Sequence, residues 1–351
     1  MSSDPRLGQF KVSLTGDAYD GDRPRFDDID LGILCQHKHI SCTRFAEHRK
    51  IITPDQIGDA QGVIVLSPHV TRESVRSSRD LLAFGRFGVG YDSVDVKACT
   101  EADVLVSITA GAVDRSMAES IVTWMLALSH NVKAKDELIR RGAWDERSGF
   151  MGKELRDRTL GVVGLGRIGR ALVKLLDGFG MQQPCASDPY IEPEIAQNLG
   201  VRLVDLDEVM RSADFVSVNC PLNEETRGLI GSREIGLMKP HAYLINTARG
   251  GIVDEDALYE ALKNQRIAGA GVDVFVGEPV TEPHRFAELD KALFAPHCIG
   301  WTNEMYRDIW RAACQGMIDL SVGKRPKGVV NPEVFDRPGF RAKWDRLSVR
   351  V

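Results

Sequence analysis

The stretch Gly164-Leu165-Gly166-Arg167-Ile168-Gly169 decides the fold that this sequence predicts. It follows the apolar run Thr159 to Val163 and precedes an amphipathic run. A strand, a tight turn and a helix in this order are typical of a βαβ unit that binds a dinucleotide. Gly164 permits the turn, Gly166 lets the backbone approach a pyrophosphate, and Gly169 lets the helix pack closely on the strand.

A carboxylate follows this turn at the expected distance, about twenty residues beyond the last glycine. Asp188 ends the next apolar run, where it can accept hydrogen bonds from the adenosine ribose and repel a 2′-phosphate. Neither Pro189 nor Tyr190 is an arginine that would receive such a phosphate. A three-glycine turn alone could be an ordinary loop, but strand, helix and acid together predict dinucleotide binding and favour NAD over NADP.

Short apolar runs alternate with amphipathic stretches along the whole chain, which predicts an α/β protein with doubly wound parallel sheets. Ser116, with Glu119 three residues later, predicts the start of a long helix toward Arg141. Another helix is expected from Thr302 through Met317. The expected strands are Phe10 to Leu14, Ile40 to Phe45, Gly62 to Leu66, Leu81 to Phe87, Val104 to Ile108, Thr159 to Val163, Cys185 to Ser187, Val201 to Val204, Phe215 to Val218, Ala242 to Asn246, Ala268 to Val272 and Leu293 to Ala295.

Composition excludes several classes of protein. The 351 residues are enough for two domains, and 45 Lys and Arg against 50 Asp and Glu offer no basic surface for nucleic acid. Seven cysteines without a C-x-x-C pair indicate reduced thiols and no metal site, which favours the cytoplasm. No window is apolar enough for a signal peptide or a membrane span.

Three polar residues that follow successive expected strands match the needs of hydride transfer from a 2-hydroxy acid. Arg249 offers a bidentate cation for a carboxylate, and His297 offers a base for the hydroxyl proton. Glu278 could accept the other imidazole N–H and thereby fix the tautomer of the ring. All three are expected at the carboxyl edge of the sheet, where such folds bind ligands. Each one alone could be an ordinary surface or loop residue.

The ordered set of motifs resembles the D-isomer-specific 2-hydroxyacid dehydrogenase family over essentially the whole chain. Besides the glycine turn, the resemblance rests on Phe87-Gly88-Val89-Gly90-Tyr91-Asp92-Ser93-Val94-Asp95, Cys220-Pro221-Leu222 with Thr226, Asn246-Thr247-Ala248-Arg249-Gly250, Gly271-Val272-Asp273-Val274-Phe275 and His297-Cys298-Ile299-Gly300.

This resemblance implies residue roles that spacing alone does not supply. His297 would be the acid/base, Glu278 its partner, and Arg249 the residue that binds the carboxylate or carbonyl of the substrate. The N–H groups of Val89 and Gly90 would hold the substrate carboxylate. The NAD site would comprise Gly164, Gly166, Arg167, Ile168, Gly169, Asp188, Pro221, Thr226, Thr247, Ala248, Arg249, Asp273, His297 and Gly300, with Asp273 reaching the nicotinamide amide; Asp273 could instead pair with nearby backbone.

The family architecture implies two Rossmann-like or flavodoxin-like domains with a cleft between them. Residues 1–115 and 303–351 would form the substrate domain, and residues 116–302 the NAD-binding domain. The resemblance further implies a homodimer through the cofactor domains.

The sequence leaves open more than one kind of substrate and more than one class of function. Arg72, Arg86 and His69 could attract a substrate phosphate, whereas Phe84, Phe87, Tyr91 and Trp301 could shape a pocket for an uncharged side chain or simply pack in the core. One alternative function is an NAD-sensing binding protein similar to dehydrogenase-like corepressors. A second is formate dehydrogenase, whose members typically place Gln where this chain has Glu278.

Overall fold

The computed structural model describes residues 9–21, 23–26, 29–76 and 79–349. The chain divides into two compact units. The outer unit consists of Met1–Val113 with Thr302–Val351, and the central unit consists of Asp114–Trp301. The divisions expected from the sequence lie after residues 115 and 302.

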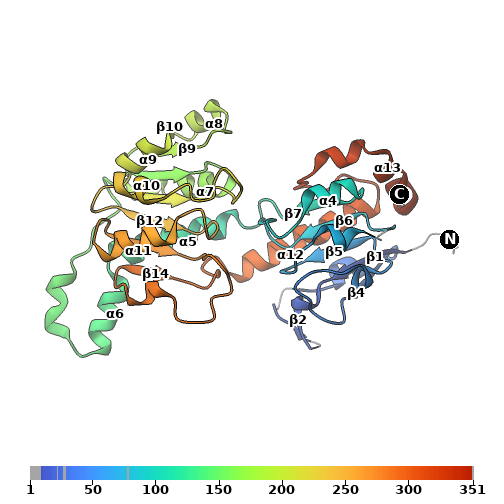
Figure 1. Ribbon diagram of the computed structural model, residues 1–351, viewed down its shortest axis with the longest axis horizontal. Coiled ribbons are helices and arrows are strands. Elements are labelled where there is room, and N and C mark those ends of the chain that lie inside the picture. The colour runs from blue at the N-terminus through green and yellow to red at the C-terminus, as the bar shows by residue number, and fades with distance from the viewer. Residues whose placement is uncertain (1–8, 22, 27–28, 77–78, 350–351) are drawn as a thin grey trace. The chain divides into compact units, whose positions relative to one another are not determined.

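The outer unit is built on a five-stranded parallel sheet in the order β4-β1-β5-β6-β7 (Figure 1). This is the flavodoxin-like strand order. The strands are β1 (Phe10–Leu14), β4 (Ile40–Arg44), β5 (Gly62–Val65), β6 (Ala83–Arg86) and β7 (Leu105–Ile108). The α-helices are α1 (Gly32–Cys35), α2 (Pro54–Ile57), α3 (Arg72–Val75), α4 (Val96–Glu101), α12 (Asn303–Ser321) and α13 (Pro338–Leu347). The sequence did not predict the small antiparallel hairpin of β2 (Tyr19–Asp20) and β3 (Arg23–Pro24).

The C-terminal segment completes the outer unit through both apolar and polar contacts. Met317 of α12 lies where side chains on Gly62 and Gly85 would have to be, so these two strand glycines make room for the helix. Asn331 is fully buried, accepts a hydrogen bond from the Val106 N–H at 2.8 Å and donates to the Val104 carbonyl at 3.0 Å. The segment after α12 is therefore tied to strand β7 by bonds that would be costly to lose.

The central unit is built on a seven-stranded parallel sheet in the order β10-β9-β8-β11-β12-β13-β14. This is the classical dinucleotide-binding order with one further strand, and its order reverses between β8 and β11. The strands are β8 (Leu160–Val163), β9 (Cys185–Ser187), β10 (Arg202–Leu203), β11 (Phe215–Val218), β12 (Tyr243–Asn246), β13 (Gly269–Val272) and β14 (Ala292–Phe294).

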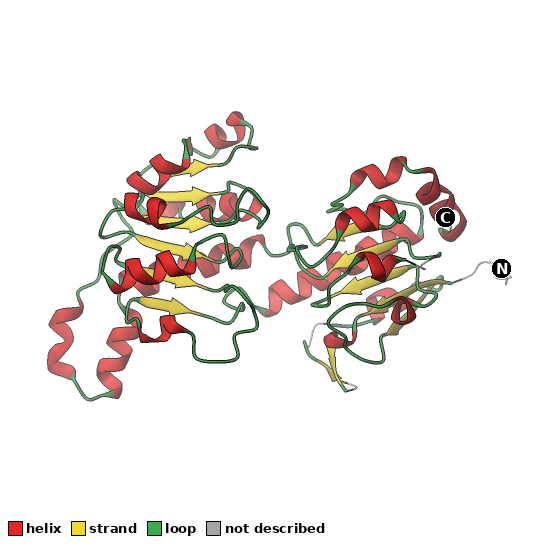
Figure 2. Cartoon of the chain, viewed as in Figure 1, coloured by secondary structure: helices red, strands yellow, loops and turns green. Residues whose placement is uncertain are grey.

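Helices cover both faces of this sheet, as Figure 2 shows. Two separate apolar cores result, one under α5 (Asp114–Ser129) and α7 (Arg167–Leu175), the other under α9 (Leu206–Ser212), α10 (Ser232–Leu237) and α11 (Glu255–Lys263). The remaining helical segments of this unit are α6 (Val132–Arg140), α8 (Pro193–Asn198) and the 3-10 turns Trp144–Phe150, Asp177–Phe179 and Arg285–Glu288.

The long helix expected after Ser116 differs from the prediction in two ways. It begins two residues earlier, at Asp114, and the Ser116 hydroxyl donates to the Gly300 carbonyl instead of capping the helix. The helix also ends at Ser129, because Asn131 has a left-handed backbone (φ 53°) that no α-helix continues through. None of the helices formed by the described residues is long and apolar enough to cross a bilayer.

Candidate functional site

The three glycines of the first turn differ in their surroundings, since Gly164 and Gly169 are crowded and Gly166 is open. Gly164 has φ +93°, and a Cβ there would lie 2.7 Å from the backbone nitrogen of Cys220. A Cβ on Gly169 would lie 2.7 Å from the Gly164 carbonyl, so α7 packs directly on the turn. At Gly166, which precedes α7, no described atom lies within 4 Å of such a Cβ. The helix N-terminus therefore presents an open backbone that suits a pyrophosphate.

Asp188 binds the glycine turn itself. Its Oδ2 accepts the Leu165 N–H at 2.8 Å, and its Oδ1 accepts the Tyr190 N–H at 2.9 Å. The Tyr190 hydroxyl donates to Glu225 Oε2 at 2.5 Å, and the hydrogen bond and charge of Glu225 raise the pKa of Tyr190. The loops that follow β9 and β11 are thus joined beside the turn, a link that the sequence did not reveal because Glu225 belongs to no motif.

The other predicted cofactor residues of this region lie on the same loops. Thr226 donates from its hydroxyl to the Pro221 carbonyl at 2.6 Å, which closes the loop after β11. Arg167, the first residue of α7, pairs with Asp114 Oδ2 at 2.9 Å, and Ile168 follows it. The structure therefore brings these residues together around the point where the strand order reverses.

The loop after β12 carries Arg249 and is shaped by the buried Asn246. The Asn246 side chain accepts the Ala248 N–H and donates to the Arg249 carbonyl, both at 3.1 Å. Thr247, the first residue of this loop, is buried. A Cβ on Gly250 would overlap the Phe275 carbonyl, so this loop lies in backbone contact with the loop after β13. The Arg249 Nη1 donates to the Ala248 carbonyl at 2.7 Å.

Glu278 and His297 form a hydrogen-bonded pair between the loops that follow β13 and β14. The distance from His297 Nδ1 to Glu278 Oε2 is 2.7 Å, and Glu278 Oε1 accepts the Phe275 N–H at 2.8 Å. Burial alone would raise the pKa of Glu278. The hydrogen bonds from His297 and Phe275, with the charges of His297 and Arg249, outweigh burial and lower that pKa. Glu278 is therefore a carboxylate near neutral pH.

Asp273 organises the segment that carries His297. Its Oδ1 accepts the N–H groups of Cys298 at 2.9 Å and Ile299 at 3.1 Å, and its carbonyl accepts the His297 N–H at 2.8 Å. His297 has a left-handed backbone (φ 55°), which these bonds maintain. Burial raises the pKa of Asp273 to about 6, against the opposing effect of the two N–H groups. The pairing of Asp273 with backbone N–H groups is the alternative that the sequence left open. A contact of Asp273 with nicotinamide stays a prediction.

Gly300 ends this segment in a packed position. A Cβ there would overlap the sulfur of Met117, and the Gly300 carbonyl accepts the Ser116 hydroxyl. The described contacts therefore give Gly300 a packing role against α5, and its place in the NAD site stays a prediction.

The remaining predicted residues belong to the outer unit or its border. Val89 and Gly90 follow β6 and are partly exposed. Phe84 and Phe87 are buried, as expected of core residues, whereas Tyr91 and Trp301 are exposed. His69 is exposed, and the Arg86 Nη1 donates to the Val65 carbonyl at 3.2 Å.

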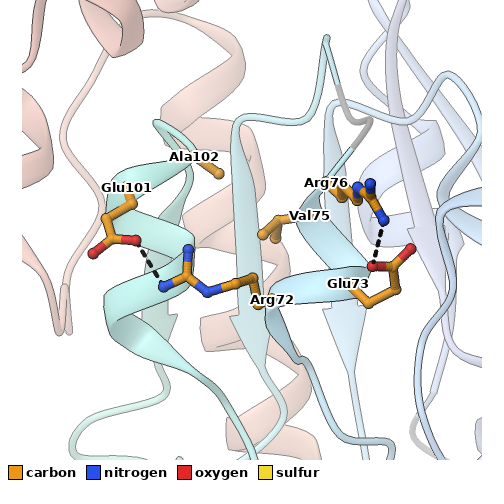
Figure 3. Close-up of a pocket in the computed structure, with 6 residues that line it drawn as sticks. All are labelled: Arg72, Glu73, Val75, Arg76, Glu101 and Ala102. Carbon is orange, nitrogen blue, oxygen red and sulfur yellow. Dashed lines mark hydrogen bonds and ion pairs between the residues drawn. The ribbon is translucent and has the colours of Figure 1, made fainter.

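Arg72 lies in a pocket between α3 and α4 that Figure 3 shows. Its guanidinium pairs with Glu101 at 2.7 Å, and the neighbouring Arg76 pairs with Glu73 at 3.4 Å. Both arginines of this pocket already face carboxylates, so the pocket offers little net positive charge to a substrate phosphate.

Comparisons with known proteins show the family of this chain. The model of the D-isomer specific 2-hydroxyacid dehydrogenase NAD binding domain matches residues 122–298. A D-3-phosphoglycerate dehydrogenase of Methanocaldococcus jannaschii is 39% identical over 279 residues, which cover 79% of this chain and 53% of that protein. A glyoxylate reductase of Thermococcus litoralis is 34% identical over 279 residues, which cover 78% of this chain and 84% of that protein. The chain thus spans about half the length of the phosphoglycerate dehydrogenases that it matches.

Solved structures show the same architecture. The structure of a glyoxylate reductase from Paecilomyes thermophila has a TM-score of 0.80 at 26% identity and covers 93% of this chain and 99% of its own. A D-lactate dehydrogenase from Aquifex aeolicus, complexed with NAD and lactic acid, has a TM-score of 0.76 at 25% identity and covers 88% of this chain and 94% of its own. The predicted fold class and the nicotinamide cofactor are confirmed.

The raised pKa of Asp273 predicts a pH-dependent effect of the substitution Asp273→Asn. The carboxyl binds its proton more tightly in the folded state, so its contribution to stability is present below pH 3.8 and is lost as the pH rises through about 6. An amide keeps an acceptor and carries no charge. Relative to the wild type, we expect the variant to gain about 1–2 kcal/mol in free energy of unfolding between pH 5 and pH 8.

Urea-induced unfolding at both pH values measures this difference. Asp273→Ala is the control, because it loses the acceptor and should be destabilised at both pH values. An Asn variant whose stability relative to the wild type does not change with pH would contradict the assignment.

Proposed function

Because this chain belongs to the D-isomer-specific 2-hydroxyacid dehydrogenase family, we propose that it moves a hydride between NAD(H) and carbon-2 of a small D-2-hydroxy or 2-oxo acid. The observation that carries this proposal is the contact of His297 Nδ1 with Glu278 Oε2 at 2.7 Å. An imidazole held in this way has one nitrogen left for the substrate.

His297 moves the proton of the reaction. Bound NAD supplies the acceptor or donor of the hydride. Because Nδ1 faces Glu278, Nε2 is the atom that accepts the hydroxyl proton during oxidation and returns it during reduction. The Glu278 carboxylate stabilises the imidazolium that forms, and it fixes the tautomer of the neutral ring. The proton and the hydride together account for the two hydrogens that the alcohol loses.

Arg249 binds the substrate in this proposal. Its positive charge is the smallest of the effects that act on the Glu278 pKa, and it lowers that pKa. A guanidinium can take a carboxylate and a carbonyl oxygen with bidentate geometry. The N–H groups of Val89 and Gly90 are proposed as further donors to the substrate carboxylate.

The glycine turn and its neighbours hold the cofactor in this proposal. The open backbone at Gly166 and the N-terminus of α7 fit a pyrophosphate, and Asp188 fits the adenosine ribose. The residues proposed to line the rest of the site are Gly164, Arg167, Ile168, Gly169, Pro221, Thr226, Thr247, Ala248, Asp273 and Gly300.

The alternatives of a cofactor-sensing binding protein and of formate dehydrogenase are not favoured. The relatives at 39% and 34% identity are named as a dehydrogenase and a reductase of hydroxy or oxo acids. A proton acceptor is unnecessary for formate, whereas the Glu278 and His297 pair suits an alcohol.

We also propose a homodimer through the central unit. The segment of α6 and the turn Trp144–Phe150 extends away from the seven-stranded sheet (Figure 1). It exposes large apolar side chains, among them Ile139, Trp144 and Met151. Apolar groups gathered on a projecting segment are typical of an interface, and a second copy is the commonest occupant of such a surface.

Replacement of His297 by Ala tests the acid/base role. We expect NADH oxidation with glyoxylate, hydroxypyruvate, pyruvate and 3-phosphohydroxypyruvate to fall about 100-fold or more, while NADH still binds with nearly unchanged affinity. Steady-state rates and a fluorescence titration with NADH measure the two effects. A variant that turns over as fast as the wild type would exclude this residue as the acid/base.

Asp188→Ala tests the ribose contact. Without the carboxylate, the repulsion of a 2′-phosphate disappears, so the ratio of the NADPH and NADH dissociation constants should fall about tenfold, with NADH itself bound more weakly. Glu192→Ala, an exposed change on the same loop, serves as the control. An unaltered ratio would reject the role of Asp188.

Trp144→Glu tests the homodimer. A charge in the proposed apolar interface should shift the molecular mass in sedimentation equilibrium from that of two chains toward that of one. The control is Lys174→Glu, on the far-removed α7. A wild-type chain that sediments as a monomer at micromolar concentration would refute the proposal.

A further inference from the structure

A half-buried carboxylate outside the proposed catalytic set contacts the loop that carries Glu278. Glu255 is the first residue of α11, and its Oε1 accepts the Val276 N–H at 2.6 Å. The adjacent N–H, that of Phe275, donates to Glu278 Oε1 at 2.8 Å. Two successive backbone amides thus bind two carboxylates, one that belongs to the proposed site and one that does not.

His284 contacts the other oxygen of the Glu255 carboxylate. Its Nδ1 accepts the Phe286 N–H at 3.4 Å, which leaves the proton on Nε2. Nε2 lies 3.5 Å from Glu255 Oε2, and the two side chains are only 21% and 18% exposed. The imidazole also packs between Phe275 and Phe286, with ring centroids at 4.9 and 4.7 Å. His284 is therefore fixed in ring orientation and tautomer.

We infer that Glu255 and His284 are positioning residues for the acid/base pair. The contacts run from the Phe286 N–H through His284 and Glu255 to the Val276 N–H, and from the neighbouring Phe275 N–H through Glu278 to His297. A backbone segment separates the two halves, so this arrangement carries no proton. It sets where the Glu278 carboxylate lies.

Phe275 is buried at one end of this loop, whereas the residues after it are more exposed. Gly277, with φ +78°, separates Val276 from Glu278, and Val276 itself is 62% exposed. On the other side, Gly250 contacts the Phe275 carbonyl. The Phe275 carbonyl thus lies against Gly250, and the next N–H, that of Val276, is bound by Glu255. A hydrogen bond to a charged acceptor is worth more than one to a neutral acceptor, which suits this anchoring role.

This inference rests on the proposed function, and Glu255→Ala tests it. We expect kcat for the best 2-oxo acid to fall about 10- to 100-fold, because a small displacement of Glu278 disturbs the His297 ring. The Michaelis constant for NADH should not change, since the glycine turn is untouched. Glu255→Gln keeps an acceptor for the Val276 N–H and should restore part of the rate.

Matched variants separate positioning from general destabilisation. His284→Gln keeps a donor near Nε2 and should retain more activity than His284→Asn, which keeps only the acceptor for the Phe286 N–H. Glu260→Ala, on the same helix, removes a side chain that bonds the neighbouring Asn264 and should behave as the wild type. Equal kcat values for Glu255→Ala and the wild type would overturn the inference, as would equal losses in the Ala and Gln variants.

A second measurement does not depend on turnover. In the protein labelled with 15N-histidine, the ring-nitrogen shifts of His297 report whether Nδ1 still bonds a carboxylate, and comparison with His297→Ala assigns its signals. We expect those shifts to move in Glu255→Ala and to stay in Glu260→Ala. If the wild type reduces no 2-oxo acid, the proposed function fails while the shifts still decide the positioning role; unmoved shifts in Glu255→Ala would refute that role.

Discussion

Parallel pairing in one register is the constraint on which the rest of the central unit depends. Val218, Asn246, Val272 and Phe294 are successive partners across β11, β12, β13 and β14, so four strands end in one row. In the central unit, the loops that carry Arg249, Glu278 and His297 leave the sheet from this row, and the glycine turn leaves from its continuation through Val163. Parallel topology therefore brings residues that are far apart in sequence to one edge of the sheet.

Carboxylates then fix the loops by binding backbone N–H groups. Asp188 binds the glycine turn, Asp273 binds the segment after His297, Glu278 binds Phe275 and Glu255 binds Val276. Charged acceptors form stronger hydrogen bonds than neutral ones, and buried N–H groups are costly to leave unpaired. Irregular loops gain in this way a fixed geometry that secondary structure cannot give them. Burial of such a carboxylate costs free energy, as at Asp273, where burial disfavours the ionised form and raises the pKa.

The sequence predicted the strands and the pairing of Glu278 with His297 because both follow from local patterns and from parallel topology. The role of Arg249 beside them stays a prediction. All the expected strands formed, within two residues at their ends. The sequence did not predict features that depend on single residues outside the periodic pattern or the motifs. The break at Asn131 needs a left-handed backbone that no motif marks. Glu255 and Glu225 were missed because an acid at a helix start or in a surface loop has an ordinary explanation.

The crowding at Gly250 has a consequence for attempts to change the substrate range of this protein. A methyl group there would force the Arg249 loop and the Phe275 loop apart, so libraries that randomise position 250 sample chiefly broken sites. Exposed positions such as Tyr91 and Trp301 carry no such steric penalty. Changes of specificity by substitution are therefore easier at such exposed positions than at Gly250, where the Phe275 backbone leaves no space for a side chain.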